Sequence, residues 1–351
     1  MIDVMVPRDV RDGVVAAMDS CFEDIAQRIG QVEGFDGVWE TAREASEGGK
    51  MLRPHLLLSA YGAFAVEPAE SAVQVAAAME LLHLAFLLHD DVIDRDLVRR
   101  GRPNLIARRY DIARGQGMND SAALRYGDGC AILAGDVLLS AAHRLVAEVD
   151  EPLDVRRGLL RALDDAILAA AVGEHADLVI GLRGVADESA ILRTMRDKTA
   201  RYSFSAPLRM GALLGGASAE VIAALGVIGD TIGIAFQARD DVLGVFGDPQ
   251  RTGKSALSDL REGKVTLLIA AARADPAWRE VAHLFGRPEL EETDAALIRA
   301  VIERSGARTR VEAAITRFAE DARASLEPVT LPSTLVDDLE RVLVTVTEPL
   351  G

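Results

Sequence analysis

The sequence has few cysteines, few aromatic residues and no excess of positive charge, and each shortage argues against a class of protein. Cys21 and Cys130 are its only cysteines and form no close-spaced pair, so nothing indicates a disulfide framework or a structural zinc site. The chain carries 39 Lys and Arg against 55 Asp and Glu, a formal net charge of −16, which rules out nucleic-acid binding by bulk positive charge. We therefore expect a reducing compartment and no nucleic-acid partner.

The sequence also lacks the signals of a secreted or membrane protein. Residues 1–13 contain no basic segment followed by an apolar one, so we expect neither a secretion signal nor a transit peptide. No apolar run approaches the ~18 to 20 residues that a membrane span requires. We therefore expect a cytoplasmic protein without a transmembrane segment.

Aromatic residues number only 15 (9 Phe, 4 Tyr and 2 Trp), although 49% of the chain is hydrophobic. This hydrophobic fraction is rich in Ala and Leu, which favour helices, whereas strands favour aromatic and β-branched residues. The sequence therefore predicts an all-α fold, and because no linker or repeat divides it we expect one domain over residues 1–351. The expected helices are residues 9–30, 50–64, 68–94, 129–149, 152–182, 187–215, 218–246, 256–273, 292–323 and 333–346.

Two of these helices, residues 68–94 and 218–246, are long, strongly apolar and not cleanly amphipathic. A helix buried on most of its sides has this composition. We therefore expect a helical bundle in which the two helices are central and a cavity is built from their facing side chains.

An acidic cluster follows the apolar part of the first central helix. Asp90 and Asp94 are spaced i, i+4, so on a helix their carboxylates lie on one face and repel each other, and Asp91 lies beside them. The C-terminal end of a helix favours cations, which makes this arrangement less favourable still. One interpretation is a frayed and solvated helix end; the other is a site that binds a cation.

A second pair, Asp240 and Asp241, lies near the end of the other central helix, 150 residues later. If the two helices run side by side, both pairs share one cavity, and we expect Asp90 and Asp240 to converge there. Carboxylates without His or Cys ligands favour Mg²⁺, which completes its shell with water and substrate phosphate. No glycine-rich nucleotide loop is present, so side chains must hold the phosphate.

Basic residues that could hold phosphate occur in small groups along the chain. A single Lys or Arg is most often a solvated surface residue, but these groups flank the acidic clusters, where they could bind two anionic groups with the help of the metal. The candidates are Lys50, Arg53, Arg99, Arg100, Lys198, Lys254 and Lys264.

Seven segments between about residues 48 and 268 carry a family resemblance. In order they read GGKMLRP, ELLHLAFLLHDDVIDRDLVRRG, LAGDVLL, DKTARYSFSAPLRMG, FQARDDVLGVFGD, GK and LREGKVTL. The chain resembles the trans-isoprenyl diphosphate synthases, the polyprenyl synthetase family, and among them those that make geranylgeranyl diphosphate. The resemblance implies an isoprenoid synthase-type helical fold, a homodimer, and condensation of isopentenyl diphosphate with an allylic diphosphate (dimethylallyl, geranyl or farnesyl).

The resemblance also implies a role for each site residue. Asp90 and Asp94, supported by Asp91, match Mg²⁺ ligands, and Asp240, with Asp241 close by, matches the ligand of a third ion. Arg99, Lys198 and Lys254 match residues that bind the allylic diphosphate. The isopentenyl diphosphate pocket is matched by Lys50, Arg53, His83 and Arg100, and the positions that face the allylic cation are matched by Lys198, Thr199 and Gln237. Lys264 is a candidate by its position alone, because after Asp241 it would lie where a substrate enters the cavity. His83 could instead be an ordinary core histidine.

The length of the product depends on the helix surface before Asp90. Phe86 and Ala85 lie one turn deeper, where the prenyl tail descends. A large ring there acts as a floor; Ala85 opens one position, and Leu82 and Met79 could form the next floor. We therefore favour geranylgeranyl diphosphate, with farnesyl or longer products as alternatives, and Phe86 in general core packing as the competing interpretation.

Three features depart from the family pattern. Gly244 stands where the second motif usually has a third Asp, Glu174 stands where Gln is frequent, and the C-terminus TEPLG lacks the basic tail of some members. We expect Gly244 to weaken the support of the metal site without abolishing activity. A non-catalytic regulatory homologue and a class I terpene cyclase remain as alternatives.

Overall fold

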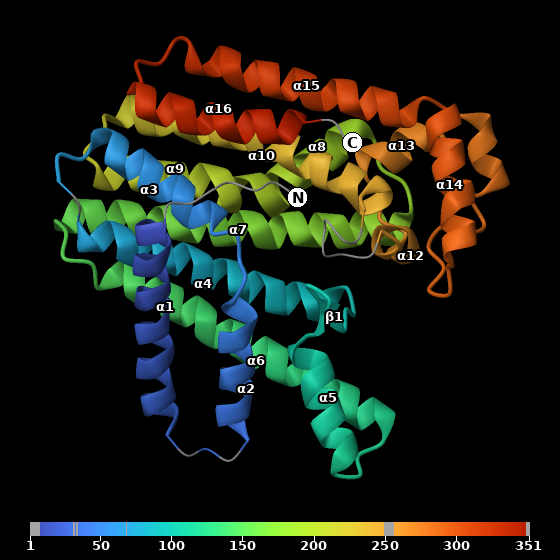
Figure 1. The fold of residues 1–351 in the computed structure, drawn as a ribbon, viewed down its shortest axis with the longest axis horizontal. Helices are drawn as coiled ribbons and strands as arrows, with labels where there is room; N and C mark the ends of the chain where they lie inside the picture. The colour runs from blue at the N-terminus through green and yellow to red at the C-terminus, as the bar shows by residue number, and fades with distance from the viewer. Residues whose placement is uncertain (1–7, 31, 33, 68, 249–255, 349–351) are drawn as a thin grey trace. The chain divides into compact units, whose positions relative to one another are not determined.

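The structure is a computed structural model that describes residues 8–30, 32, 34–67, 69–248 and 256–348. Within these residues it is helical nearly throughout, with one two-stranded ribbon, which agrees with the all-α prediction (Figure 1). The elements are α1 (Arg8–Ile29), α2 (Phe35–Ser46), α3 (Leu52–Phe64), α4 (Glu70–Ile93), β1 (Val98–Arg99), β2 (Arg102–Pro103), α5 (Leu105–Gly115), α6 (Asp120–Ala147), α7 (Leu153–Arg183), α8 (Glu188–Met195), η1 (Arg196–Ser205), α9 (Ala206–Leu214), α10 (Ala219–Phe246), α12 (Ser258–Glu262), α13 (Leu267–Arg273), η2 (Pro276–Glu280), α14 (Glu292–Arg304), α15 (Ala307–Leu326) and α16 (Ser333–Thr347).

The chain divides into two compact units. Among the described residues, the N-terminal unit lies within residues 8–58 and 67–160, and the C-terminal unit lies within residues 59–66 and 161–348. Helices α3 and α7 each contribute residues to both. A single domain over the whole chain stays a prediction.

In the N-terminal unit α4 packs along α6, with α5 against α6 and α1 against α4 (Figure 1). Small residues allow the close approach: a Cβ atom on Gly127 of α6 would lie 3.1 Å from Cγ2 of Ile106 on α5. Asparagine side chains begin two of these helices, because Oδ1 of Asn104 accepts from the amide of Ala107 at 3.0 Å and Oδ1 of Asn119 accepts from that of Ala122 at 2.9 Å. This packing fixes α4, which carries the first acidic motif.

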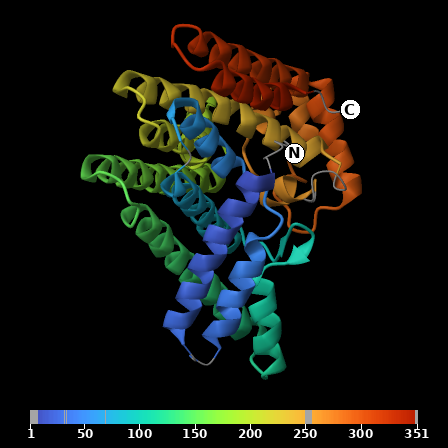
Figure 2. The ribbon, with the colours of Figure 1, turned by 60° about the vertical axis from the view of Figure 1, so that its left-hand side comes forward.

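In the C-terminal unit α10 is the central helix. It packs against η1, α9 and α15, and Figure 2 shows it beneath the last two helices of the chain. A Cβ atom on Gly233 would meet the backbone and Cβ of Ala200, so glycine there lets η1 lie directly on α10. Oγ of Ser218 caps α10 by accepting from the amide of Val221 at 3.4 Å. The second acidic motif thus lies on a helix that packs against several others of this unit.

Several expected helices are interrupted. The predicted helix 187–215 has a π-helical middle, η1, and the predicted helix 292–323 breaks at Gly306, which adopts a left-handed conformation with φ 68°. The predicted helix 256–273 is two short helices, and α6 begins at Asp120 rather than residue 129. Helices α2 and α5 and the β1–β2 ribbon were not predicted.

The expectation that no segment is long and apolar enough to span a membrane is wrong. By length and composition α4, α6 and α10 each qualify. The reason is that isolated polar residues interrupt their apolar runs without lowering the average by much. In α4, 72% of the apolar window is buried inside the protein itself, so packing against other helices accounts for most of its apolar character.

Candidate active site

The first acidic motif lies at the C-terminal end of α4. Asp94 ends the helix, and its amide donates to the carbonyl of Asp90 at 2.8 Å. This turn keeps both side chains on one face, with carboxylate oxygens of Asp90 and Asp94 within 4.8 Å of one another. Asp91 points elsewhere and its side chain is only 2% exposed.

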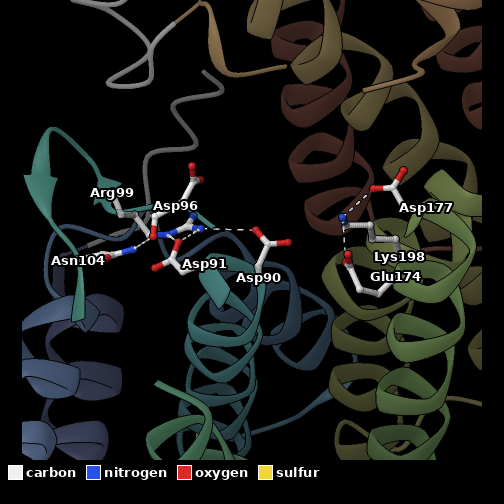
Figure 3. A network of polar contacts seen from close by, with 8 residues as sticks. All are labelled: Asp90, Asp91, Asp96, Arg99, Asn104, Glu174, Asp177 and Lys198. Atoms are coloured by element: carbon white, nitrogen blue, oxygen red, sulfur yellow. Dashed lines mark hydrogen bonds and ion pairs between the residues drawn. The ribbon is translucent and has the colours of Figure 1, made fainter. Parts of the chain in front are cut away.

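Arg99 of β1 compensates part of this negative charge. Its Nε donates to Oδ1 of Asp91 at 2.7 Å and its Nη2 to Oδ2 of Asp90 at 3.4 Å (Figure 3). Burial raises the pKa of Asp91, and the hydrogen bond and charge of Arg99 act against that rise. Burial would lower the pKa of Arg99, but Asp91, Asp90 and Asp96 raise it above its ordinary value.

The ribbon that carries Arg99 is a tight hairpin. Its two central residues, Arg100 and Gly101, have φ of 52° and 71°, as a type I′ turn requires. Below it, Nδ2 of Asn104 donates to the carbonyl of Asp96 at 2.7 Å. These contacts fix Arg99 over the end of α4.

The donor set of α4 fits Mg²⁺. Asp90 and Asp94 offer carboxylate oxygens only, which are the hard ligands that this ion prefers. Two carboxylates from one helix leave most of the coordination shell to water and substrate oxygens. Asp91 has its Oδ1 bound to Arg99, so it can support the site by holding that residue.

The second acidic motif, in the C-terminal unit, is part of a chain of polar contacts on α10 and η1. Oγ1 of Thr199 donates to Oε1 of Gln237 at 2.9 Å, and Nε2 of Gln237 donates to Oδ1 of Asp241 at 2.8 Å. Nζ of Lys264 lies 3.9 Å from the same oxygen. The structure therefore brings four of the predicted residues together, and Asp240 lies next to them, half-buried.

Two charged groups of this cluster, Asp241 and Lys264, have shifted pKa values. Burial raises the pKa of Asp241 to about 7, while Lys264 and the hydrogen bond from Gln237 act against the rise. Burial alone would lower the pKa of Lys264, but Asp259, Asp241, Asp177 and Asp240 raise it well above its ordinary value.

Lys198 of η1 lies between two carboxylates of α7. Its Nζ is 2.8 Å from Oε2 of Glu174 and 2.9 Å from Oδ2 of Asp177 (Figure 3). A Cβ atom on Gly173 would meet the backbone of Lys198, so the glycine allows this close approach. Sequence reasoning missed Asp177, although its i, i+3 spacing from Glu174 places both on one face of α7.

The residues expected to bind isopentenyl diphosphate gather in the N-terminal unit. His83 and Arg100 line one pocket, and Nη1 of Arg100 donates to the carbonyl of Glu47 at 2.5 Å. Lys50 is half-buried in the segment between α2 and α3, and Arg53 follows in the first turn of α3. Lys254 lies outside the described residues. The pocket is lined by Met18, Ala45, Ser46, Glu80, His83, Leu84, Leu87 and Arg100.

Glu80 is the pocket residue that sequence reasoning missed. It is 6% exposed, and its Oε2 has no hydrogen-bond partner among the described residues. Burial raises its pKa, whereas Arg53, Arg100 and Arg11 act to lower it. A glutamate in the middle of an apolar helix was the available signal, because such a residue is rarely buried without cations nearby.

Comparison with known proteins decides what this arrangement is. The model of the polyprenyl synthetase family matches residues 40–302. The chain belongs to the polyprenyl synthetase family. The predicted enzyme class, a trans-prenyltransferase, is thereby confirmed.

Individual relatives agree. The geranylfarnesyl diphosphate synthase of Aeropyrum pernix is 36% identical over 286 residues, covering 80% of this chain and 84% of the relative. The geranylgeranyl diphosphate synthase of Methanosarcina mazei is 36% identical over 253 residues, 71% of each chain. A solved geranylgeranyl pyrophosphate synthase of Corynebacterium glutamicum, complexed with isoprenyl diphosphate and magnesium, has a TM-score of 0.88 and 31% identity over 97% of this chain and 98% of that one. The predicted isoprenoid synthase-type fold is confirmed.

In this polyprenyl synthetase the residues expected to limit product length lie on α4 before the acidic motif. Ala85, Leu82 and Met79 are completely buried, and Phe86 is half-buried. Since Phe86 lies four residues before Asp90, its ring is on the same face one turn away. The role of these residues stays a prediction.

Proposed function

We propose that this polyprenyl synthetase condenses isopentenyl diphosphate with an allylic diphosphate in the trans configuration, and that geranylgeranyl diphosphate is its main product. The observation that carries the proposal is the pair of carboxylates at the end of α4, Asp90 and Asp94, with Arg99 beside them. Synthases of geranylgeranyl diphosphate among the relatives support the product. The small side chain of Ala85 supports it as well.

Each acidic motif has a proposed role in binding metal. Asp90 and Asp94 would hold Mg²⁺, and Asp240 would hold a third ion. Bound Mg²⁺ supplies positive charge that stabilises the departing pyrophosphate. Arg99 and Lys198 would each bind diphosphate oxygens directly, since guanidinium and ammonium donors both suit phosphate oxygens.

The reaction needs no protein nucleophile. The allylic C–O bond breaks, the isopentenyl double bond forms the new C–C bond to the cation, and a proton passes to the departed pyrophosphate. Oxygen atoms of Thr199 and Gln237, held 2.9 Å apart by their hydrogen bond, would face the cation as fixed dipoles. Lys50, Arg53, His83 and Arg100 would hold the isopentenyl diphosphate.

We also propose a homodimer that works in the cytoplasm. Leu124 and Ile132 of α6 are 41% and 43% exposed, and their spacing of eight residues places them on one face. A second copy covering this face would remove that apolar surface from water. The burial of most of α4 inside the protein argues for a role of that helix in a bundle rather than in a membrane.

Product sizing tests the proposal. The purified chain is incubated with Mg²⁺, isopentenyl diphosphate and dimethylallyl, geranyl or farnesyl diphosphate in turn, and products are identified by mass spectrometry. We expect a twenty-carbon diphosphate from each primer. No product from any primer would indicate a regulatory homologue, and a cyclised product formed without isopentenyl diphosphate would indicate a terpene cyclase.

A further inference from the structure

The segment LAGDVLL, residues 133–139, is one of those that carry the family resemblance, and it supplies none of the proposed ligands of metal or substrate. It lies in the middle of α6, which packs along α4 in the N-terminal unit (Figure 1). Its Gly135 faces His89, the residue that precedes Asp90 on α4. The segment therefore meets α4 at the turn that carries the first acidic motif.

Gly135 leaves a space that the imidazole ring of His89 fills. A Cβ atom on Gly135 would lie 2.6 Å from Cδ2 of His89 and closer still to its Nε2. Any residue larger than glycine would therefore push the ring, or the turn of α4 that carries it, away from α6. The side chain of His89 is 26% exposed, so most of the ring is enclosed by protein.

Two acceptors on α6 lie close to Nε2 of the same ring. The carbonyl oxygen of Ile132 is 3.3 Å from Nε2, and Oδ1 of Asp136 is 3.5 Å from it. A carbonyl and an ionised carboxylate can only accept, so Nε2 must carry a hydrogen to bond the first and to be attracted by the second. The two acceptors therefore select the form of His89 that donates from Nε2, and they fix the direction in which the ring points.

The last turn of α4 needs an anchor of this kind. Asp90, Asp91 and Asp94 place like charges within one turn at the C-terminal end of a helix, and the turn has no Lys or Arg of its own. Arg99 holds Asp91 and Asp90 from the side of the β1–β2 ribbon. His89 holds the same turn from the side of α6.

We infer that His89 is a positioning residue for the first acidic motif, and that Gly135 and Asp136 of α6 form the socket that holds it. Because His89 and Asp90 are adjacent on one helix, a displacement of the ring is transmitted to the turn that presents the carboxylates. The contact between the two helices stands on geometry alone. Its effect on metal binding rests on the proposed function, in which Asp90 and Asp94 hold Mg²⁺.

A stability cycle tests the socket without metal or substrate. In G135A the new methyl group meets the imidazole ring, so we expect Tm to fall by about 2 to 6 °C. H89A lowers Tm as well, because it empties the socket. In H89A/G135A the methyl group enters the emptied space, so G135A should cost little relative to H89A alone. Equal losses in both backgrounds would show that the two positions do not share space and would overturn the inference.

The Mg²⁺ requirement tests the positioning role. We expect H89A to raise the half-saturating Mg²⁺ concentration of the condensation about tenfold, with the KM of isopentenyl diphosphate at saturating Mg²⁺ unchanged. H89Q should recover most of that loss, because a glutamine amide can donate from nearly the same place as Nε2. The matched control is H143Q, which removes from α6 a histidine whose Nδ1 lies 2.9 Å from the carbonyl oxygen of Leu139 in its own helix. It should leave the Mg²⁺ requirement unchanged.

A second readout needs no turnover. The shift in Tm produced by Mg²⁺ with inorganic pyrophosphate should be smaller in H89A than in the wild type, and H89Q should restore it. A wild type that makes no product but shows this shift would refute the proposed reaction, and the shift in H89A would still test the inference. A wild type with neither product nor shift would overturn both.

Two results would overturn the role of His89 in an active wild type. If H89A lowers Tm but keeps the wild-type Mg²⁺ requirement and the wild-type Tm shift, His89 is a structural residue and positions no metal ligand. If H89Q folds but recovers neither quantity, the hydrogen on Nε2 is not what holds the turn.

Discussion

Lys198, which we propose to bind the allylic diphosphate, is held by two carboxylates. Its Nζ lies 2.8 Å from Oε2 of Glu174 and 2.9 Å from Oδ2 of Asp177, and all three side chains are 20 to 22% exposed. An incoming diphosphate must share Lys198 with them or displace one. Replacing Glu174 with Gln removes one negative charge and keeps the shape of the side chain. We therefore predict that E174Q binds the allylic diphosphate more tightly than the wild type.

The magnitude follows from the burial of the pair. A hydrogen bond to a charged group contributes about 1.5 to 3 kcal/mol when buried, whereas an exposed ion pair contributes about 0.2 to 1 kcal/mol. At roughly one-fifth exposure we expect an intermediate value, about 1 to 2 kcal/mol, after allowing for solvent screening. That energy corresponds to about a 5- to 30-fold decrease in the KM of the allylic diphosphate.

The assay is steady-state condensation with the allylic diphosphate varied at saturating Mg²⁺ and isopentenyl diphosphate. D165N removes an exposed carboxylate from the same helix and should leave KM unchanged, and added salt should narrow the difference between E174Q and wild type. An unchanged or higher KM in E174Q would refute the reasoning. A higher Mg²⁺ requirement in E174Q would show instead that Glu174 holds metal.

Three further predictions concern the N-terminal unit. D91A leaves Arg99 without its most buried partner, so the free energy of unfolding in urea should fall by about 3 kcal/mol, and in D91N it should fall by less. A D91A variant as stable as the wild type would contradict the pairing of Asp91 with Arg99. F86A removes a ring one turn below Asp90, and mass analysis should show a product at least one isoprene unit longer; an unchanged product profile would place Phe86 in core packing. E80Q removes the negative charge that attracts Arg100, so the KM of isopentenyl diphosphate should rise about tenfold while the KM of the allylic substrate stays constant. A parallel rise of both KM values would indicate general damage to the protein.

Much of the fold follows from local composition. Helices α4 and α10 were predicted nearly to their ends because long Ala- and Leu-rich runs have few alternatives to a buried helix. Helices α2 and α5 were missed because they are short and many of their residues are charged, so that only a few apolar residues mark the buried face. In α2 these include Val38, Trp39 and Ala42. The π-helical segment η1 was not predicted, since such segments are rare insertions within α-helices and its ten residues are too few to reveal a changed period.

Some residues of the candidate site could be predicted from the sequence, and others could not. Asp90, Asp94 and Asp241 were predicted because carboxylates that follow apolar runs break the usual rule of burial. Their partners were harder to find. The sequence carried a signal for Glu80 and for Asp177, but it did not name their partners. The packing shows that Asp177 reaches Lys198 and that Glu80 lies among arginines.

Gly244 shows why a motif is an incomplete description of a site. The second acidic motif lacks a carboxylate at position 244 of α10, and from the motif alone we expect a weaker metal site. Measured in space, the carboxylate of Asp259 lies against Gly244, fifteen residues later in the sequence. Chemistry depends on where charge lies and not on which element supplies it. The expectation that Gly244 weakens the metal site therefore stays a prediction, and it depends on the charge around position 244 as well as on the missing side chain.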